Sequence, residues 1–352
     1  MRPRIAVVGG GAVGAYVGGH LSRLGHDVVI IDWWPENVEA IRTHGLHITG
    51  MTEAETCNIA VPTLHLTEAQ QLAKERPIDI AMVCVKSYDT EWATMMIRQY
   101  LAPSGFVLSI QNCINEERIA GVVGWGKVVG CVASSISVDL HKAGHVRRLV
   151  PMGGDKHIVF RVGEVHGRIT DRATMLAEML GGIDSAKATT NLWGERWSKL
   201  CQNGMKNGVS AATGLSNTTM DTYAEIRDFS IRLGGQAVRI GQAHGFTLEK
   251  VSGFAPELLE RAAYGDKAAY EEVDAKMLQA AQNSGRNSDG RPSMGQDMLK
   301  GRRTEITFMN GFIADKGAEI DIAAPAHVAL TEIVLKVERG EMPARAENVF
   351  GV

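Results

Sequence analysis

The sequence predicts a two-domain protein of the α/β class, with an N-terminal doubly wound parallel sheet followed by an all-α domain. Three observations predict this. Short apolar, β-branched runs alternate with helical patterns through the first half of the chain, a glycine-rich turn joins the first run to the first helix, and strand patterns nearly vanish after about residue 170. The 352 residues are enough for two cores, which we place at 1–188 and 189–352, with the boundary in 184–191.

The strands of the first domain are predicted from runs that are apolar throughout, because a strand covered by helices on both faces shows no alternation. These runs lie at 4–9, 27–32, 78–86, 105–112 and 127–137. The segment 147–165 breaks the rhythm, and we expect it to add antiparallel strands at an edge of the sheet.

The second half contains long stretches with the spacing of helices, at 192–214, 225–245, 255–282, 304–319 and 325–341, after a first one at 171–183. The polar tract 282–293 is rich in Gly, Asn and Ser, and it predicts a mobile connection beside Ser293.

Composition excludes several classes of function. A net charge of -3 gives no bias toward polyanions, so nucleic acid is not an expected partner. No apolar run approaches the roughly 18 to 20 residues that cross a bilayer, so we expect no membrane and a cytoplasmic location. The five cysteines form no CxxC pair and are expected to be reduced; the eleven histidines form no HExxH, and no metal site is expected.

The stretch RIAVVGGGAVGAYVGGHLSRLGHDVVIID, residues 4–32, matches a Rossmann dinucleotide site. Gly9 is expected to make the tight turn, Gly11 to let a pyrophosphate approach, and Gly14 to let the helix pack close to the strand. The helix would begin with Ala12 and Val13, whose end of the helix faces the phosphates.

Asp32 ends the second strand of this unit, where a carboxylate can accept hydrogen bonds from the adenosine ribose and repel a 2′-phosphate. The next Lys or Arg is Arg42. We therefore predict NAD(H) rather than NADP(H). Lys86 and Asn112 each follow a buried strand, so both could reach the nicotinamide half of the cofactor or the substrate; each is also read as an ordinary polar residue at a strand end.

The helix expected at 192–214 carries Lys199, Asn203 and Asn207 on one side, since the two asparagines fall roughly 40° and 80° around from the lysine. A solvated polar face explains this pattern. The alternative is a substrate site, because asparagine is a poor helix former and occurs twice on the stripe.

A carbonyl reductase needs a proton donor beside the oxygen, and a partly buried lysine suits that role. Downstream, four polar residues are candidates for the same site or for a capped, solvated helix start: Ser293, Asp297, Glu305 and Asn310.

Several motifs together resemble the ketopantoate reductase (2-dehydropantoate 2-reductase) family: VVGGGAVG, VCVKSYDT, IQNCINEE, LWGERWSKLCQNGMKNGVSAATG, PSMGQDMLKGRRTEITFMNGF and GAEIDIAAPAHVALTEIVLKVERGE. The resemblance implies a Rossmann domain and a helical domain, with Lys199 as general acid and with Asn203 and Asn207 holding substrate. It implies that Glu305 binds the substrate hydroxyl or positions the lysine and that Ser293 binds the substrate carboxylate. Asn112 and Lys86 would lie at the nicotinamide.

Three departures from the family pattern leave the substrate open. Cys113 replaces a usual glycine, Asp32 predicts NAD where the family mostly uses NADPH, and extra length lies between about 254 and 292. We expect an oxidoreductase that interconverts a small 2-oxo acid and its 2-hydroxy acid, or a related ketone and alcohol. An apolar helical domain of this kind favours a homodimer. Two alternatives are an NAD-dependent dehydrogenase of the same family that oxidises another hydroxylated compound in catabolism, and a non-catalytic NAD(H) sensor.

Overall fold

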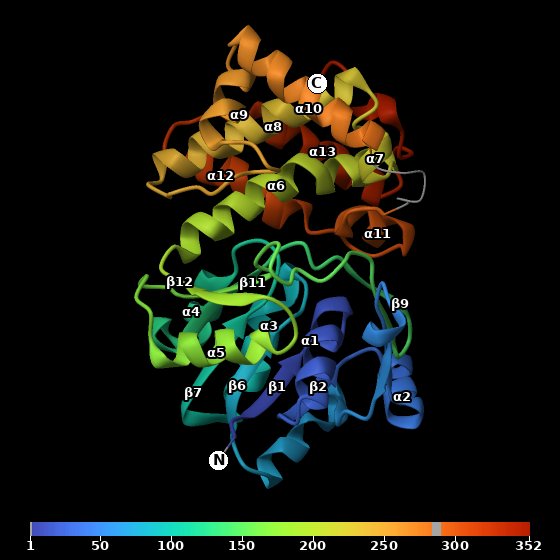
Figure 1. Cartoon of the computed structure of the whole chain (residues 1–352), viewed down its shortest axis with the longest axis vertical. Coiled ribbons are helices and arrows are strands. Elements are labelled where there is room, and N and C mark those ends of the chain that lie inside the picture. The colour runs from blue at the N-terminus through green and yellow to red at the C-terminus, as the bar shows by residue number, and fades with distance from the viewer. Residues whose placement is uncertain (1, 284–289) are drawn as a thin grey trace. The chain divides into compact units, whose positions relative to one another are not determined.

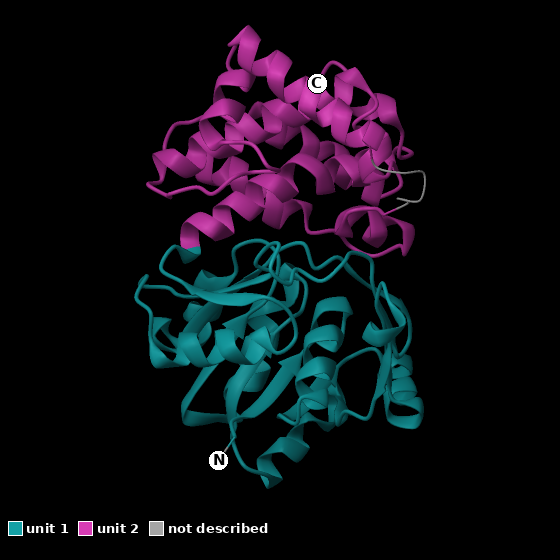
Figure 2. Ribbon diagram, viewed as in Figure 1, with its two compact units in different colours: residues 1–192 teal, residues 193–352 magenta. Residues whose placement is uncertain are grey.

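The computed structural model describes residues 2–283 and 290–352. The chain forms two compact units, Met1–Leu192 and Trp193–Val352 (Figure 2). The division falls at the end of the segment 184–191 that the sequence marks as the boundary, and slightly later than residue 188.

An eight-stranded sheet forms the centre of the first unit, in the order β12-β11-β8-β7-β6-β1-β2-β5 (Figure 1). Its neighbours pair in parallel except β11 and β8, which are antiparallel. The chain moves from β1 to β2 in one direction and from β6 to β8 in the other, so the order reverses between β1 and β6. The strands are β1 (Arg4–Val8), β2 (Asp27–Asp32), β5 (Thr63–His65), β6 (Ile78–Val83), β7 (Leu101–Ser109), β8 (Val128–Ala133), β11 (Phe160–Glu164) and β12 (Ala186–Thr189).

Helices cover both faces of this sheet, which explains why its strands are apolar throughout. Val7 of β1 belongs to the core shared with α1 (Ala12–Arg23), α2 (Pro35–His44) and α5 (Asp171–Gly181). Val8 belongs to the core on the other face, shared with α3 (Thr90–Arg98) and α4 (Glu116–Val123). The doubly wound fold expected from the sequence is confirmed.

A second sheet corrects the expectation for the segment 147–165. Its order is β4-β3-β10-β9, from β3 (Leu46–Thr49), β4 (Cys57–Ile59), β9 (Val138–Lys142) and β10 (His145–Arg148). The expected antiparallel strands therefore divide: β11 joins the main sheet, whereas β10 joins this small one. β12 lies where the sequence suggested only a boundary, because a four-residue strand is too short to leave a periodic pattern.

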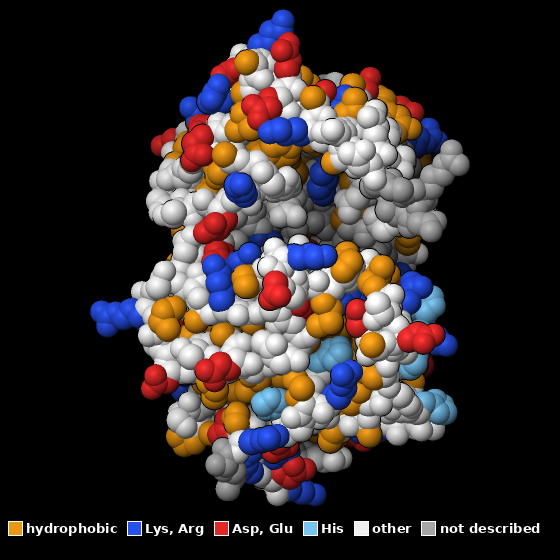
Figure 3. Space-filling model, in the orientation of Figure 1, with side chains coloured by type: hydrophobic (Ala, Val, Ile, Leu, Met, Phe, Trp, Pro, Cys, Tyr) orange, Lys and Arg blue, Asp and Glu red, His pale blue; other side chains and the backbone are white. Residues whose placement is uncertain are grey.

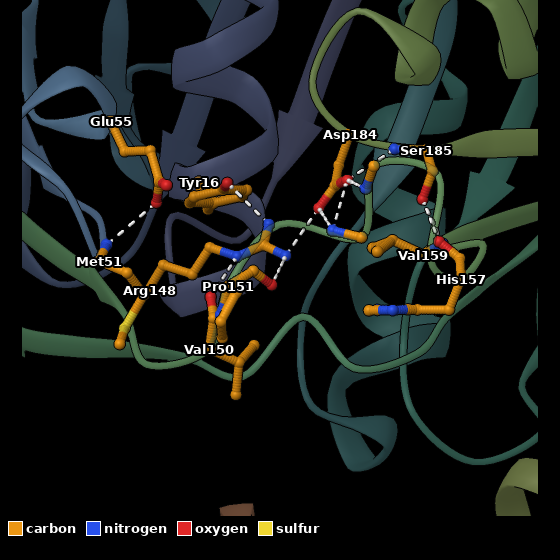
Figure 4. A network of polar contacts seen from close by, with 12 residues as sticks. Tyr16, Met51, Glu55, Arg148, Val150, Pro151, His157, Val159, Asp184 and Ser185 are labelled. Carbon is orange, nitrogen blue, oxygen red and sulfur yellow. Dashed lines mark hydrogen bonds and ion pairs between the residues drawn. The ribbon is translucent and has the colours of Figure 1, made fainter.

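A buried polar network ties the small sheet to the first unit's helices (Figure 4). Arg148 forms an ion pair with Asp184 at 2.6 Å, and each side chain is 1% exposed. Arg148 also donates to the Tyr16 hydroxyl on α1 (3.0 Å), while Asp184 accepts from the Gly153 N–H (2.9 Å). A buried ion pair persists only when its remaining hydrogen-bonding groups are satisfied, as they are here.

The second unit is helical, as expected. Trp197 of α6 lies in its core and donates to the Ala237 carbonyl of α8 (2.8 Å). Its helices are α6 (Leu192–Thr213), α7 (Asn217–Met220), α8 (Ala224–Ala243), α9 (Pro256–Ala263), α10 (Lys267–Asn283), α11 (Ser293–Leu299), the π-helix η5 (Thr307–Gly311), α12 (Phe312–Ala318) and α13 (Pro325–Glu338).

The helix predicted over 255–282 is two helices, α9 and α10, because Gly265 adopts φ +98° between them. These two helices occupy most of the extra length noted in the sequence. The tract predicted to be mobile lies partly outside the described residues, since 284–289 are not described.

The surface carries mixed charge. On the face drawn in Figure 3, basic and acidic side chains are interspersed. Within residues 2–283 and 290–352, no helix is both long and apolar enough to cross a membrane.

Candidate functional site

The glycine turn between β1 and α1 contains glycines of two kinds. Gly9 has φ +102°, and a Cβ there would lie 3.0 Å from the Val85 nitrogen; a Cβ at Gly14 would lie 1.9 Å from the Gly9 carbonyl oxygen. The fold itself therefore requires glycine at both positions.

Gly11 is different. Its backbone is extended, with φ -67° and ψ -169°, and a Cβ there would meet no heavy atom of the described chain within 4 Å. Nothing in these contacts demands glycine at Gly11, whereas the close approach of a phosphate to the backbone would. Ala12 and Val13 follow, half-buried, as the first residues of α1, and the positive end of the helix dipole lies there.

Asp32 ends β2 and lies beside this turn, 4% exposed. Asn37 of α2 donates both to Asp32 Oδ2 (2.6 Å) and to the Gly10 carbonyl (3.0 Å), and its own oxygen accepts from the Gly144 N–H (2.8 Å). Burial raises the pKa of Asp32, against hydrogen bonds from Asn37 and from backbone N–H groups that lower it. The buried Asn37 thus holds the acid, the turn and the second sheet together, a role that its place in the sequence did not reveal.

Arg42, the first basic residue after Asp32, is directed elsewhere. Its guanidinium donates to the Thr63 carbonyl (2.8 Å) and forms an ion pair with Glu68, which lowers the pKa of that carboxyl. These contacts hold Arg42 against the segment around β5, so it is engaged within the fold.

Lys86 and Asn112 are half-buried in the segments that follow β6 and β7. Two amides join these segments. Asn115 donates to Ser87 Oγ (3.1 Å) and to the Asn112 carbonyl (2.9 Å), and Gln111 donates to the Val85 carbonyl (2.8 Å). Because β6 and β7 are parallel neighbours, both segments lie at the carboxyl edge of the sheet. Sequence reasoning missed Gln111 and Asn115, although the three amide side chains of IQNCINEE, directly after a strand, were the available signal.

Cys113 has φ +64° and is 5% exposed. This left-handed conformation costs a residue with a side chain about 1–2 kcal/mol, and glycine almost nothing. The backbone conformation therefore accounts for a glycine at this position, and Cys113 adopts it under strain.

In the second unit, α6 carries the polar stripe. Lys199 and Asn203 are half-buried, and Asn207 is 6% exposed. The opposite arc is core, as the periodicity predicts: Trp197, Leu200, Cys201, Met205 and Val209 are at most 1% exposed.

Ser293 joins this stripe from 86 residues along the chain. It begins α11, and its hydroxyl donates to Asn207 Oδ1 (3.0 Å), while Asn207 Nδ2 donates to the Asn203 carbonyl (3.2 Å). Three of the expected substrate-site residues are therefore linked in one chain of hydrogen bonds.

Glu305 and Asp297 are 2% and 4% exposed, which argues against the alternative of a solvated helix start. Glu305 lies two residues before the π-helix η5, and its carbonyl accepts from the Phe308 N–H (3.0 Å). Irregular helical turns of this kind are frequent at functional sites.

Asn310 lies in the interior of the second unit. It is fully buried, and its amide donates to the Gly204 carbonyl (2.9 Å) and to His327 Nδ1 (3.1 Å). Burial lowers the pKa of His327 to about 4, so the ring is neutral and its Nε2–H donates to the Leu233 carbonyl (2.9 Å). Asn310 thus joins α6 to α13 inside the unit, and a contact between Asn310 and a substrate stays a prediction.

The described residues contain no group of three His, Cys, Asp or Glu side chains arranged to hold a metal ion. In the same residues all five cysteines are free thiols.

Comparison with known proteins decides the family. Residues 5–158 match the model of ketopantoate reductase PanE/ApbA, and residues 191–338 match the model of its C-terminal domain. The chain belongs to the ketopantoate reductase family. The family resemblance expected from the motifs is thereby confirmed. Both units match models of this oxidoreductase family.

Curated relatives agree with this assignment, and solved structures share the fold. The 2-dehydropantoate 2-reductase of Archaeoglobus fulgidus is 28% identical over 96% of this chain and 98% of its own, and that of Pyrococcus horikoshii is 26% identical over 94% and 96%. The ketopantoate reductase structure from Ralstonia eutropha has a TM-score of 0.76 at 24% identity, covering 96% and 99%. D-mandelate dehydrogenase with NADH and anilino(oxo)acetate has a TM-score of 0.77 at 22% identity, covering 96% and 98%.

Proposed function

We propose that this protein is an NAD(H)-dependent oxidoreductase that interconverts a 2-oxo acid and its 2-hydroxy acid, with Lys199 as the general acid. The observation that carries the proposal is the hydrogen bond between Ser293 and Asn207. The two residues belong to separate motifs, and the sequence predicted that both serve one substrate site.

The residues of the α6 stripe suit a reaction that turns a keto oxygen into a hydroxyl. A bound nicotinamide would supply the hydride, which would leave negative charge on that oxygen, and Lys199 would supply the proton. Asn203 and Asn207 are neutral, so they orient groups nearby without quenching the lysine by charge pairing.

A hydrogen-bond donor beside this stripe, the hydroxyl of Ser293 on α11, suits the carboxylate of a 2-oxo acid. The Ser293 hydroxyl can rotate from Asn207 toward a substrate oxygen, since a hydroxyl proton turns to suit its partner. Glu305 serves either to accept from the substrate hydroxyl or to position Lys199, and Asn112 and Lys86 serve the nicotinamide end.

The preference for NAD over NADP is supported by two features of the first unit. Asp32 stands at the end of β2, where its charge disfavours a 2′-phosphate, and Arg42 is engaged by Glu68 and the Thr63 carbonyl. We expect the kcat/KM for NADH to exceed that for NADPH.

A second candidate function keeps this site and changes its direction. Asp32 favours NAD, which cells keep largely oxidised, and this suits oxidation of a hydroxy acid other than pantoate. Cys113, at a usual glycine position, adds a side chain near the expected nicotinamide end and is consistent with a different substrate.

One assay tests both candidates. Absorbance at 340 nm is followed with NADH and ketopantoate, and then with NAD and a panel of 2-hydroxy acids that includes mandelate. Turnover with ketopantoate supports the first candidate, and turnover only with another hydroxy acid supports the second. Binding of NADH without turnover on any compound would favour an NAD(H) sensor and would contradict the proposal.

The lysine role has its own test. Lys199→Ala is expected to lower kcat by about two to four orders of magnitude, the usual worth of general acid catalysis, with little change in NADH affinity. Lys267→Ala is the matched control, since that side chain is 89% exposed on α10. Unchanged kcat in Lys199→Ala would remove this residue from the proton-donor role.

A further inference from the structure

Two tryptophans are exposed at the carboxyl edge of the main sheet. Trp33 directly follows β2, and Trp92 lies in the first turn of α3; each is 40% exposed. Their ring centroids are 5.9 Å apart and their planes meet at 89°, so the rings form a corner that leaves aromatic surface uncovered. Tryptophan is usually largely buried, and an exposed aromatic pair often marks a binding site.

The position of this corner follows from the sheet order. β2 and β6 flank β1, and Trp92 is carried by the helix that follows β6. A contact between Trp33 and Trp92 therefore spans the carboxyl end of β1, where the glycine turn lies. The order of the strands also reverses between β1 and β6, which is where open α/β sheets bind ligands.

Trp33 is tied to the ribose end of the expected cofactor site. Its N–H donates to Asp32 Oδ1 (2.9 Å), and its carbonyl lies 3.2 Å from His65 Nε2 on the next strand, β5. Backbone contacts thus fix the residue while its indole ring stays exposed.

We propose that Trp33 and Trp92 form the adenine-binding wall of the dinucleotide site, with the base stacked on one indole and meeting the edge of the other. This inference rests on the proposed function. With the pyrophosphate at the start of α1 and the adenosine ribose beside Asp32, the base is the next group outward, and the aromatic corner is the next surface.

The chemistry of the corner suits a neutral heterocycle. Stacking of a base on an aromatic side chain needs no charge. Loss of the aromatic side chain usually weakens binding of the base by about 5- to 100-fold. An edge-to-face pair is itself a favoured arrangement of aromatic rings, so the corner is formed before the base arrives.

The test compares fragments of the cofactor. Isothermal titration measures NADH, ADP-ribose and nicotinamide mononucleotide against the full chain, against Trp33→Ala and against Trp92→Ala. Each variant is expected to raise the Kd of NADH and of ADP-ribose by about 5- to 100-fold and to leave the mononucleotide unchanged. Trp92→Phe, which keeps an aromatic face, is expected to restore most of the affinity.

Trp125→Ala is the matched control. Trp125 is 50% exposed in the turn η4 (Trp125–Lys127), which directly precedes β8 and therefore lies at the opposite, amino edge of the sheet. It is expected to bind all three ligands like the unmodified protein. In steady-state assays, the alanine variants at the corner should raise the KM for NADH and keep kcat, because the base takes no part in hydride transfer.

The outcomes separate this inference from the proposed function. If the unmodified protein binds neither NADH nor ADP-ribose, the proposed function fails. If it binds and turns over NADH, but Trp33→Ala and Trp92→Ala bind ADP-ribose like the unmodified protein, the adenine wall alone is refuted. A change in sedimentation without a change in Kd would also refute it, because the corner would then cover a protein partner.

Discussion

Gly11→Ala separates a glycine that a ligand requires from glycines that the fold requires. A Cβ at Gly11 would meet no heavy atom of the described chain within 4 Å, and its φ of -67° suits any residue. Replacing glycine by alanine at a compatible position stabilises by about 0.4–1 kcal/mol through the unfolded state. Alanine is a poorer N-cap than glycine by an amount of the same order, so the free energy of unfolding should change by less than about 1 kcal/mol.

Binding should respond much more strongly. The added methyl would occupy the space through which a pyrophosphate approaches the backbone, and we expect the Kd for NADH to rise at least about tenfold, equivalent to about 1.4 kcal/mol. Urea unfolding measures the first quantity, and isothermal titration with NADH the second. The contrast between the two numbers is the prediction.

Gly14→Ala is the control for this experiment. Its Cβ would lie 1.9 Å from the Gly9 carbonyl oxygen and 3.0 Å from Cys84 Cβ, so backbone must move and stability should fall by about 1–3 kcal/mol or more. NADH binding by Gly11→Ala within twofold of the unmodified protein would refute the reasoning, because the phosphate could not then lie against Gly11.

Three further predictions concern stability. Asn37→Leu should lower the free energy of unfolding, measured in urea, by about 2–4 kcal/mol, because it leaves the Gly10 carbonyl and the Gly144 N–H without their hydrogen-bond partner. The same variant should weaken the preference for NADH over NADPH in kinetic assays. Cys113→Gly should leave stability equal or raise it by up to about 1 kcal/mol, whereas Cys113→Val should lower it by at least about 1 kcal/mol, because φ is +64°. His327 has its pKa lowered to about 4 by burial, so the unfolded chain binds one more proton below its ordinary pKa near 6.5; stability is full above that pH and falls toward pH 4 by about 1.4 kcal/mol per unit. His327→Gln should reduce that slope by about one proton in urea titrations at several pH values, and an unchanged slope would contradict the buried neutral ring.

Much of the fold could be predicted because its strands and helices leave periodic patterns of apolar residues within short stretches of the sequence. Continuous apolar runs identified the parallel strands, and the glycine spacing identified the turn before α1. The small sheet and β12 could not be predicted in the same way. β3 and β10 pair although about a hundred residues separate them, and strands of four residues leave too little pattern to detect.

The candidate site shows the same division. Helical spacing placed Lys199, Asn203 and Asn207 on one side of α6. This prediction depended on one helix alone and required no knowledge of the elements that pack against it. Asn310 was expected in the same site from its polarity, but its burial and its hydrogen bonds to the Gly204 carbonyl and to His327 could not be predicted, because these partners lie on other helices.

By itself the sequence determined the two-unit plan, the nucleotide turn and the lysine stripe, since each depends on spacing within one or two adjacent elements. Only the tertiary structure decided that Ser293 meets Asn207, that Asn37 holds Asp32 and the glycine turn, and that Trp33 meets Trp92. Those contacts join elements whose separation along the chain carries no periodic signal, and packing of the whole unit selects them.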